Sequence, residues 1–144
     1  MSLLSYLSKK GYQKTNMKLT KTSHFKVSAK INGIKGDFIV DTGASNTCID
    51  IKLIEHFNLT SEESDTKAAG AGATDMETQI SKGNKIKIGK WKSKKSELVI
   101  FDLSHVNEAL TNHNSKPVHG IIGADLLKKG QAIIDYQTKK IFLK

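Results

Sequence analysis

Cysteine and proline are almost absent from this chain of 144 residues, which has one cysteine, Cys48, and one proline, Pro117. A lone cysteine cannot form an internal disulfide, which fits a reducing compartment. No proline-rich stretch marks a linker, and the length is sufficient for one domain with its own hydrophobic core. We therefore expect one folded domain, with the cytoplasm as the default location.

Long apolar runs are absent as well. No window reaches the roughly 18 apolar residues that a membrane-spanning helix needs. The apolar run near the N-terminus is short, and its lysines follow it instead of preceding it, unlike those of a signal peptide. We expect no membrane span. Residues 1–20 are expected to form an amphipathic or disordered arm, and residues 21–144 the folded domain.

Arginine is missing altogether, so all 23 basic residues are lysines, and the formal net charge is +9. Lysines cluster before Asp37 and again between Lys82 and Lys95. They form either a basic face for nucleic acid or an acidic partner, or solvated outer and edge positions of strands. Within residues 25–31 and 85–91 they alternate with apolar residues, and no arginine is present to bind guanine in a bidentate manner. We favour the second interpretation and expect no nucleic-acid partner.

The alternation of apolar and polar residues is the clearest structural signal. Residues 25–31 and 34–40 both alternate, and they flank Asn32-Gly33, a strong signal for a two-residue turn. The pattern predicts a β-hairpin whose second strand ends directly before Asp41.

Several further strands follow from the same pattern. Residues 76–80 and 97–101 are each expected to form a strand. Residues 81–84, Ser-Lys-Gly-Asn, are expected to turn the chain into another strand over 85–91. The acidic stretch 60–65 is expected to be a polar loop.

Short helices are expected near residues 50–59, 102–110 and 124–129, and a hairpin over 131–144. The first helix has Asp50 as its cap, and its apolar face is predicted to hold Ile51, Ile54 and Phe57. Many short strands with a few single-turn helices predict a mainly β, barrel-like domain.

One carboxylate stands out, because an apolar strand leads directly into it. The sequence "IVDTGAS", residues 39–45, places Asp41 before a Thr-Gly turn, and an unpaired buried charge is costly. About 80 residues later, "GIIGADLL" (120–127) combines apolar residues with a glycine. These two motifs, one copy of each, with a glycine-rich segment between them, resemble the retropepsin-like aspartic proteases, the single-domain, retroviral-type family with bacterial relatives. The resemblance covers the chain from Phe25 to its end.

This resemblance implies an all-β acid-protease fold with a closed barrel, and the activity of an aspartic endopeptidase. The catalytic turn is expected to be Asp41, Thr42 and Gly43. One carboxylate takes a proton from water while a second gives one to the peptide carbonyl oxygen, so that no metal or cofactor is needed. The other aspartates occupy cap, loop or strand positions. The second carboxylate is therefore expected from an identical subunit, in a symmetric homodimer.

The resemblance also implies a peptide or protein substrate held as an extended strand beneath a glycine-rich flap. The flap is expected around Ala69–Thr74. The expected substrate-binding residues are Ala44, Ser45, Ala69, Gly70, Ala71, Gly72, Ala73, Ile121 and Ile122. Ala44 replaces a Ser or Thr that usually donates a hydrogen bond to the catalytic carboxylate in pepsin-like enzymes. Activity is therefore expected from mildly acidic to near-neutral pH.

Other side chains carry weaker signals. The spacings of His105, His113 and His119 match no common zinc pattern. Cys48 and Trp91 are expected in the core. The terminal segment 141–144 either pairs with a partner subunit or closes its own sheet.

Two alternatives to a protease remain. One is a catalytically inactive module of the same fold that binds peptides or dimerises. The other is a basic nucleic-acid-binding protein in which the Asp-Thr-Gly sequence is accidental.

Overall fold

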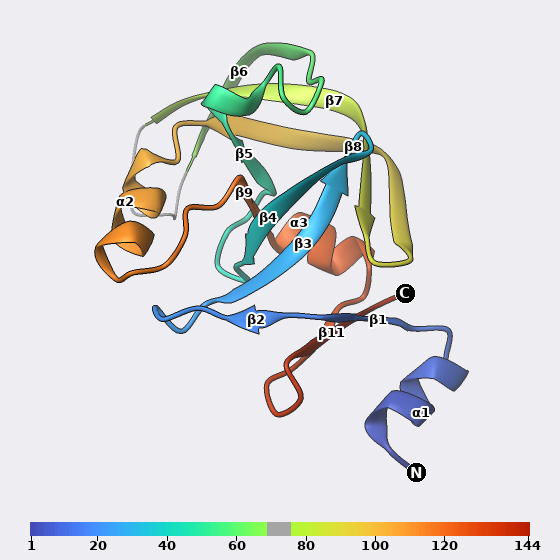
Figure 1. Ribbon diagram of the computed structural model, residues 1–144. Helices are drawn as coiled ribbons and strands as arrows, with labels where there is room; N and C mark the ends of the chain where they lie inside the picture. Colours follow the sequence, from blue (N-terminus) through green and yellow to red (C-terminus); the bar gives the residue numbers. More distant parts are fainter. Residues whose placement is uncertain (69–75) are drawn as a thin grey trace.

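The computed structural model describes residues 1–68 and 76–144, and of residues 63–68, 76 and 77 it describes the backbone alone. Most of the chain is β-structure, with few short helices (Figure 1). The strands are β1 (Gln13–Asn16), β2 (Lys18–Leu19), β3 (Phe25–Ile31), β4 (Ile34–Val40), β5 (Cys48–Asp50), β6 (Ser61–Ala68), β7 (Met76–Ile88), β8 (Trp91–Phe101), β9 (Gly120–Ile122), β10 (Ile133–Asp135) and β11 (Lys140–Leu143). The helices are α1 (Leu3–Lys9), the 3-10 helix η1 (Ile51–Leu53), α2 (Ser104–Asn112) and α3 (Ala124–Lys129).

Six strands close into a barrel. The large sheet has the order β2-β3-β4-β9-β5-β8-β7-β6, and an additional pairing of β3 with β7 completes the circuit. A smaller sheet, β1-β11-β10, lies beside it (Figure 1). The predicted all-β closed barrel is confirmed.

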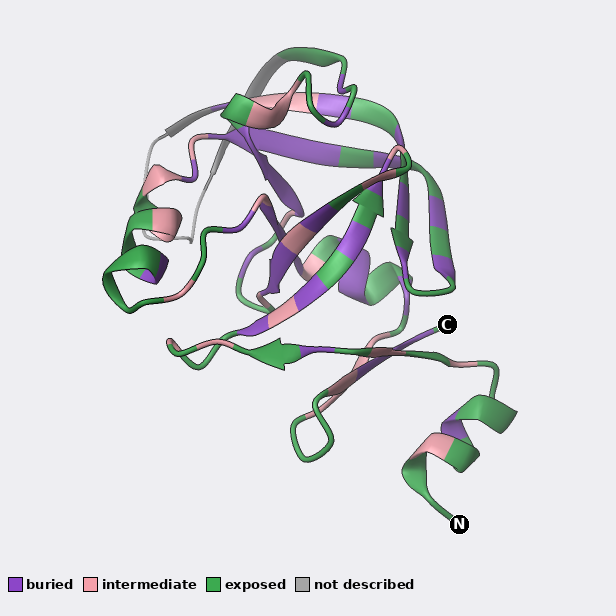
Figure 2. Cartoon of the chain, in the orientation of Figure 1, coloured by how far each residue is buried: buried purple, intermediate pink, exposed green. Residues whose placement is uncertain are grey.

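The hairpin β3–β4 forms as predicted. Ile31 pairs with Ile34 across the turn, and the register runs to Phe25 opposite Val40. Asn32 and Gly33 have φ angles of 52° and 84°, the left-handed values that a tight two-residue hairpin turn requires. Buried and exposed residues alternate along β3, so one face of the hairpin points into the barrel (Figure 2).

The turn predicted at residues 81–84 is wrong, because β7 runs through this segment without reversing. Ser81 pairs with Leu98 and Asn84 with Ser96, so the extra residue on β7 is absorbed as a bulge. The buried amide of Asn84 holds this bulge by donating to the backbone and side-chain oxygens of Ser81. The chain reverses later, between β7 and β8.

Two other local predictions need correction. The acidic stretch expected as a loop at 60–65 belongs mainly to β6, which pairs antiparallel with β7 at the edge of the large sheet. Edge strands tolerate charged side chains, since one side of the strand faces solvent. The helix expected over 50–59 is a 3-10 helix followed by turns. Asp50 caps it as predicted, but Ile51 is 38% exposed, while Phe57 is fully buried.

Both ends of the chain join the small sheet. The C-terminal strand β11 lies between β1 and β10 of the same chain, so it closes its own sheet. Of residues 1–20, α1 precedes this sheet, β1 is part of it, and β2 pairs with β3. Trp91 is buried, and its indole N–H donates to the carbonyl oxygen of Lys144 at 3.2 Å.

The interior contains two apolar clusters. The larger fills the barrel, and its fully buried side chains include Phe38, Phe57 and Ile122. The smaller packs α2 against the neighbouring strands and includes Leu110 and Ile121. No helix among the described residues has the length and apolar character needed to cross a membrane.

Candidate active site

The turn at Asp41 is set by its own backbone. Asp41 follows β4 directly, and its backbone N–H donates to the carbonyl oxygen of Ile122 at 3.0 Å. The N–H of Gly43 donates to Oδ1 of Asp41 at 2.9 Å, and the N–H of Ala44 donates to its backbone oxygen at 3.2 Å. These bonds fix the carboxylate at the mouth of the turn.

The second motif lies against the first. Strand β9 runs parallel to β4, with Ile39 opposite Ile121 and Val40 opposite Ile122. Gly123 follows, and a Cβ on it would lie 2.5 Å from the carbonyl oxygen of Asn46. Because any larger residue would collide with backbone, the close approach requires glycine.

A polar clamp between the buried Thr47 and the exposed Asp125 joins the turn to α3. The backbone N–H and the hydroxyl of Thr47 both donate to Oδ1 of Asp125, at 2.9 and 2.8 Å. Thr47 is 1% exposed, and its hydroxyl oxygen also accepts the N–H of Gly123 at 3.1 Å. The N–H of Ala124 donates to the carbonyl oxygen of Ala44 at 2.7 Å. The sequence placed Asp125 only among the aspartates at cap, loop or strand positions, whereas the structure makes it the anchor of the Asp41 loop.

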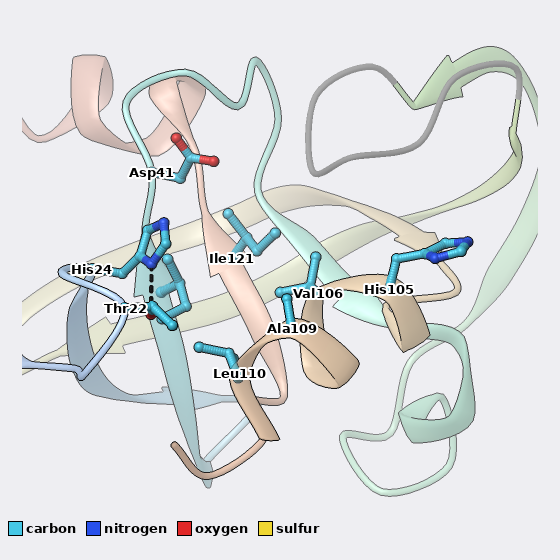
Figure 3. A pocket seen from close by; sticks show the side chains of 9 residues that line it. Thr22, His24, Asp41, His105, Val106, Ala109, Leu110 and Ile121 are labelled. Atoms are coloured by element: carbon cyan, nitrogen blue, oxygen red, sulfur yellow. Dashed lines mark hydrogen bonds between the residues drawn. The ribbon is translucent and has the colours of Figure 1, made fainter. Parts of the chain in front are cut away.

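A cavity of about 330 Å³ opens beside Asp41 (Figure 3). Its wall combines apolar side chains from β4, β9 and α2 with polar side chains from the segment before β3. The lining residues are Thr22, His24, Ile39, Asp41, His105, Val106, Ala109, Leu110 and Ile121. Of these described residues, Asp41 alone carries a carboxyl group.

His24 is one of the site residues that sequence reasoning missed. Its ring lies near the Asp41 side chain, and a 2.8 Å hydrogen bond joins its Nδ1 to the hydroxyl of Thr22 (Figure 3). The register of the β3–β4 hairpin could have indicated His24. Since Phe25 lies opposite Val40, one further step along the ladder places His24 opposite Asp41. The sequence contains no comparable indication of Thr22 or His105, because these residues lie in a loop and in a helix, outside the strand register.

The predicted substrate-binding residues fall into different places. Ile121 lines the cavity, whereas Ile122 is fully buried in the barrel core. Ala44 is buried and Ser45 is exposed, both within the turn. Thr42 is exposed and lines a separate hollow of about 280 Å³ beside α3. The predicted flap residues, Ala69, Gly70, Ala71, Gly72 and Ala73, lie outside the described residues.

Cys48 lies behind the turn as a core residue, as predicted, and is 7% exposed. Burial raises the pKa of its thiol to about 12, and the carboxylates of Asp125 and Asp41 add to the shift. The thiol is therefore protonated at neutral pH and is a poor nucleophile.

Within the described residues the histidines are not grouped as metal ligands. No group of three potential metal ligands occurs in the described part of the chain. His119 accepts the backbone N–H of Asp37 at its Nδ1, at 2.9 Å. The ring nitrogen of His113 bonds to the carbonyl oxygen of Ala109 at 2.8 Å. The donors at the cavity itself suit proton transfer and hydrogen bonding to a substrate.

The sequence matches a family model described as aspartyl protease over residues 27–126, a range that holds both the Asp41 turn and the Asp125 clamp. No curated protein gives a significant match to the sequence.

Solved structures share the fold. A retropepsin-like aspartic protease from Rickettsia conorii superposes with a TM-score of 0.65 at 18% identity, over 92% of this chain and 90% of that one. The EIAV protease in complex with the inhibitor HBY-793 gives 0.56 at 20% identity, over 76% and 90%. The retroviral protease-like domain of Ddi1 from Leishmania major gives 0.57 at 17% identity, over 88% and 90%. The fold of this chain is retropepsin-like.

Proposed function

The chain belongs to the aspartyl protease family, and on that premise we propose that it is an aspartic endopeptidase active as a homodimer. The observation that carries the proposal is the Asp41 turn. It presents one carboxylate, held by the N–H of Gly43, in a cavity of about 330 Å³ with an apolar wall. Such a cavity suits a side chain of a peptide substrate, and the carboxylate suits activation of water.

A second copy of the chain completes this site. General acid–base hydrolysis of a peptide bond needs one group that accepts a proton and another that donates one. Among the described residues that line the cavity, Asp41 is the sole carboxylic acid. Thr42 and Gly43 are exposed on the surface of the chain. A symmetric partner can therefore approach the turn, and two Asp41 residues then meet near the axis.

The dimer contact differs from that of retroviral enzymes, which interleave terminal strands. Here β11 is paired on both sides by β1 and β10 of its own chain. We place the contact at the exposed Thr42 turn, where the hydroxyl of each Thr42 reaches toward the partner turn.

The mechanism assigns one role to each copy of Asp41. The ionised carboxylate takes a proton from a water molecule, which attacks the peptide carbonyl carbon. The protonated carboxyl donates its proton to the carbonyl oxygen and gives a tetrahedral diol. The carboxyl that took the proton from water then gives it to the amide nitrogen, while the other carboxylate takes a proton from a diol hydroxyl. The C–N bond breaks, a carboxylic acid and an amine leave, and the dyad is again singly protonated.

Cleavage of a mixed peptide library by the wild type and by Asp41→Asn tests the proposal. We expect the variant to lose activity by about 10⁴-fold or more, because both proton-transfer groups are removed. A statine-type inhibitor should block the wild type. Asp37→Asn, the same change four residues earlier on β4, is the matched control and should cleave normally. Cleavage that survives Asp41→Asn contradicts the proposed chemistry.

Mixing the two chains tests the shared site separately. With equal amounts of wild type and Asp41→Asn, random pairing leaves each wild-type chain with about half of its activity. A ninefold excess of the variant should lower it to about one tenth. Activity per wild-type chain that is unaffected by the variant would show that one subunit suffices.

The pH profile tests the role of Ala44. Its side chain supplies no hydroxyl to the carboxylate, so we expect a maximum between mildly acidic and near-neutral pH. In Ala44→Ser, a hydroxyl donated to the ionised carboxylate should move the profile to lower pH. A wild-type maximum near pH 2 would contradict this interpretation.

A further inference from the structure

Four lysines lie side by side across four strands. Lys30 on β3 is directly opposite Lys35 on β4 and also opposite Lys87 on β7. Lys87 in turn is opposite Lys92 on β8. Directly paired residues share one face of a sheet, so these side chains form a continuous row on the outside of the barrel, which we call the lysine row. All four are exposed.

Two more lysines extend this surface. Lys85 and Lys94 lie two residues from Lys87 and Lys92 and therefore point to the same side of their strands. Together with Lys30 and the last two members of the row, they line a hollow of about 270 Å³. The inward positions between them are apolar or small, such as the buried Ile86 and Ser93.

The positive charge of this face is not balanced within the described residues. Like charges directly opposite one another on a sheet are destabilising. The single ion pair of the described residues joins Lys82 to Glu62, outside the row. The acids nearest to the row in sequence, Asp37 and Glu97, form none. The chain therefore keeps unfavourable lysine–lysine pairs on this face, although its net charge is already +9.

Protection of a sheet edge does not explain the row. Lysine on edge strands discourages association through unpaired backbone groups. At Lys30 and Lys87, however, β3 and β7 are hydrogen-bonded on both sides, since β3 lies between β4 and β7, and β7 lies between β3 and β8. The edge function expected from the sequence is therefore wrong for these two lysines. Their placement on the outer face is as expected.

We propose that the lysine row binds the phosphate backbone of a nucleic-acid duplex without reading its sequence. Lysine is a compact positive charge that pairs well with phosphate. Protein partners instead need apolar or aromatic anchors, and single strands need aromatic rings for stacking. The exposed large apolar residues of the described chain are Met1, Leu3, Tyr6, Leu19, Ile51 and Tyr136, and none of them lies on β4, β7 or β8. Positive charge is therefore the property by which this face can bind a partner.

The row is remote from the candidate active site. Lys35 and Asp41 stand near opposite ends of β4, six residues apart, which corresponds to about 20 Å along an extended strand. A bound duplex therefore leaves the Asp41 cavity open, and nucleic-acid binding can be tested independently of proteolysis.

Fluorescence anisotropy with labelled duplex DNA and duplex RNA of random sequence tests the proposal. Four phosphate contacts predict a slope of about −3.6 for log K against log salt concentration, which is roughly a hundredfold loss between 50 and 200 mM. In Lys30→Gln/Lys35→Gln/Lys87→Gln/Lys92→Gln we expect binding at 50 mM salt to fall by at least about tenfold and the slope to flatten toward zero. Equal binding of DNA and RNA identifies the phosphate backbone as the ligand. Binding of one duplex alone contradicts recognition by phosphate charge.

A matched variant separates this site from net charge. Lys9→Gln/Lys21→Gln/Lys116→Gln/Lys129→Gln removes the same number of exposed charges from other elements and should bind like the wild type. Equal losses in both variants, no binding by the wild type at 50 mM salt, or an unchanged slope in the row variant would each overturn the proposal. Competition by polyglutamate at equal charge concentration, as effective as unlabelled duplex, would assign the face to an acidic protein instead. Circular dichroism checks that each variant is folded.

Discussion

Charged side chains near the two ends of β4 differ in their partners. At its C-terminal end, the carboxylates of Asp41 and Asp125 each accept backbone N–H groups from the turn. At its N-terminal end, Lys35 lies beside Lys30, and among the described residues neither lysine forms an ion pair. The difference follows from solvent. The N–H and hydroxyl of Thr47 are buried and need an acceptor because water cannot reach them. The exposed lysines remain hydrated, so each unfavourable pair costs little.

The largest effect should follow from breaking the clamp at the acidic end. Asp125→Ala leaves the N–H and the hydroxyl of Thr47 without their shared acceptor, and Thr47 is 1% exposed. Each orphaned donor costs about 1–3 kcal/mol, so we expect the free energy of unfolding to fall by about 4 kcal/mol. Urea denaturation measures it, and proteolytic activity should fall as the Asp41 loop loses its anchor.

Asp125→Asn is the matched control for this prediction. Its side-chain oxygen can still accept both bonds from Thr47, so we expect it to retain most of the stability that the alanine variant loses. If the asparagine and alanine variants are equally unstable, the charge of Asp125 matters more than its hydrogen bonds.

The thiol at the same end should be inert. With its pKa raised to about 12 by burial, Cys48 should react with iodoacetamide at pH 8 at least a hundredfold more slowly than in the urea-unfolded chain. Mass spectrometry follows the labelling. Fast labelling of the native protein would show that the turn opens.

The raised pKa of Cys48 also gives stability a pH dependence. The folded thiol keeps its proton while the unfolded one loses it, so the unfolded state binds fewer protons above pH 9.0. The contribution of Cys48 is complete below pH 9.0 and is lost as the pH rises toward about 12. In Cys48→Ala, denaturation across this range should show a shallower decline than in the wild type.

The smallest change in stability is expected at the N-terminal end of β4, where the lysine row lies. Lys87→Glu places an acid between Lys30 and Lys92, so two unfavourable pairs become favourable ones. We expect a gain of about 0.5 kcal/mol in the free energy of unfolding at low salt, which disappears near 1 M salt because exposed charges are then screened. Thermal unfolding at the two salt concentrations measures it, and Lys116→Glu, at an exposed lysine outside the row, is the comparison. Destabilisation at low salt would contradict the pairing.

Much of the fold could be predicted because its signals are local. The φ preferences of Asn32-Gly33 and the alternation beside it specify the β3–β4 hairpin, whose register ends with Phe25 opposite Val40, one step before His24 and Asp41. The local signal of segment 81–84 predicted a turn, and that prediction was wrong because a distant contact outweighs the signal. Its turn-forming residues are held in a bulge by Asn84, whose amide also bonds to the carbonyl oxygen of Ser96 on the next strand at 3.4 Å. A partner outside the segment decided its conformation.

The sequence by itself determined the β3–β4 hairpin, the Asp41 turn and the apolar motif at residues 120–127, because turn chemistry and side-chain periodicity act over a few neighbouring residues. Tertiary structure alone decided that Thr47 meets Asp125, 78 residues away, and that Lys30, Lys35, Lys87 and Lys92 share one row. These contacts depend on how distant strands align. Strand register is fixed only when the whole barrel closes and every inward face is buried together.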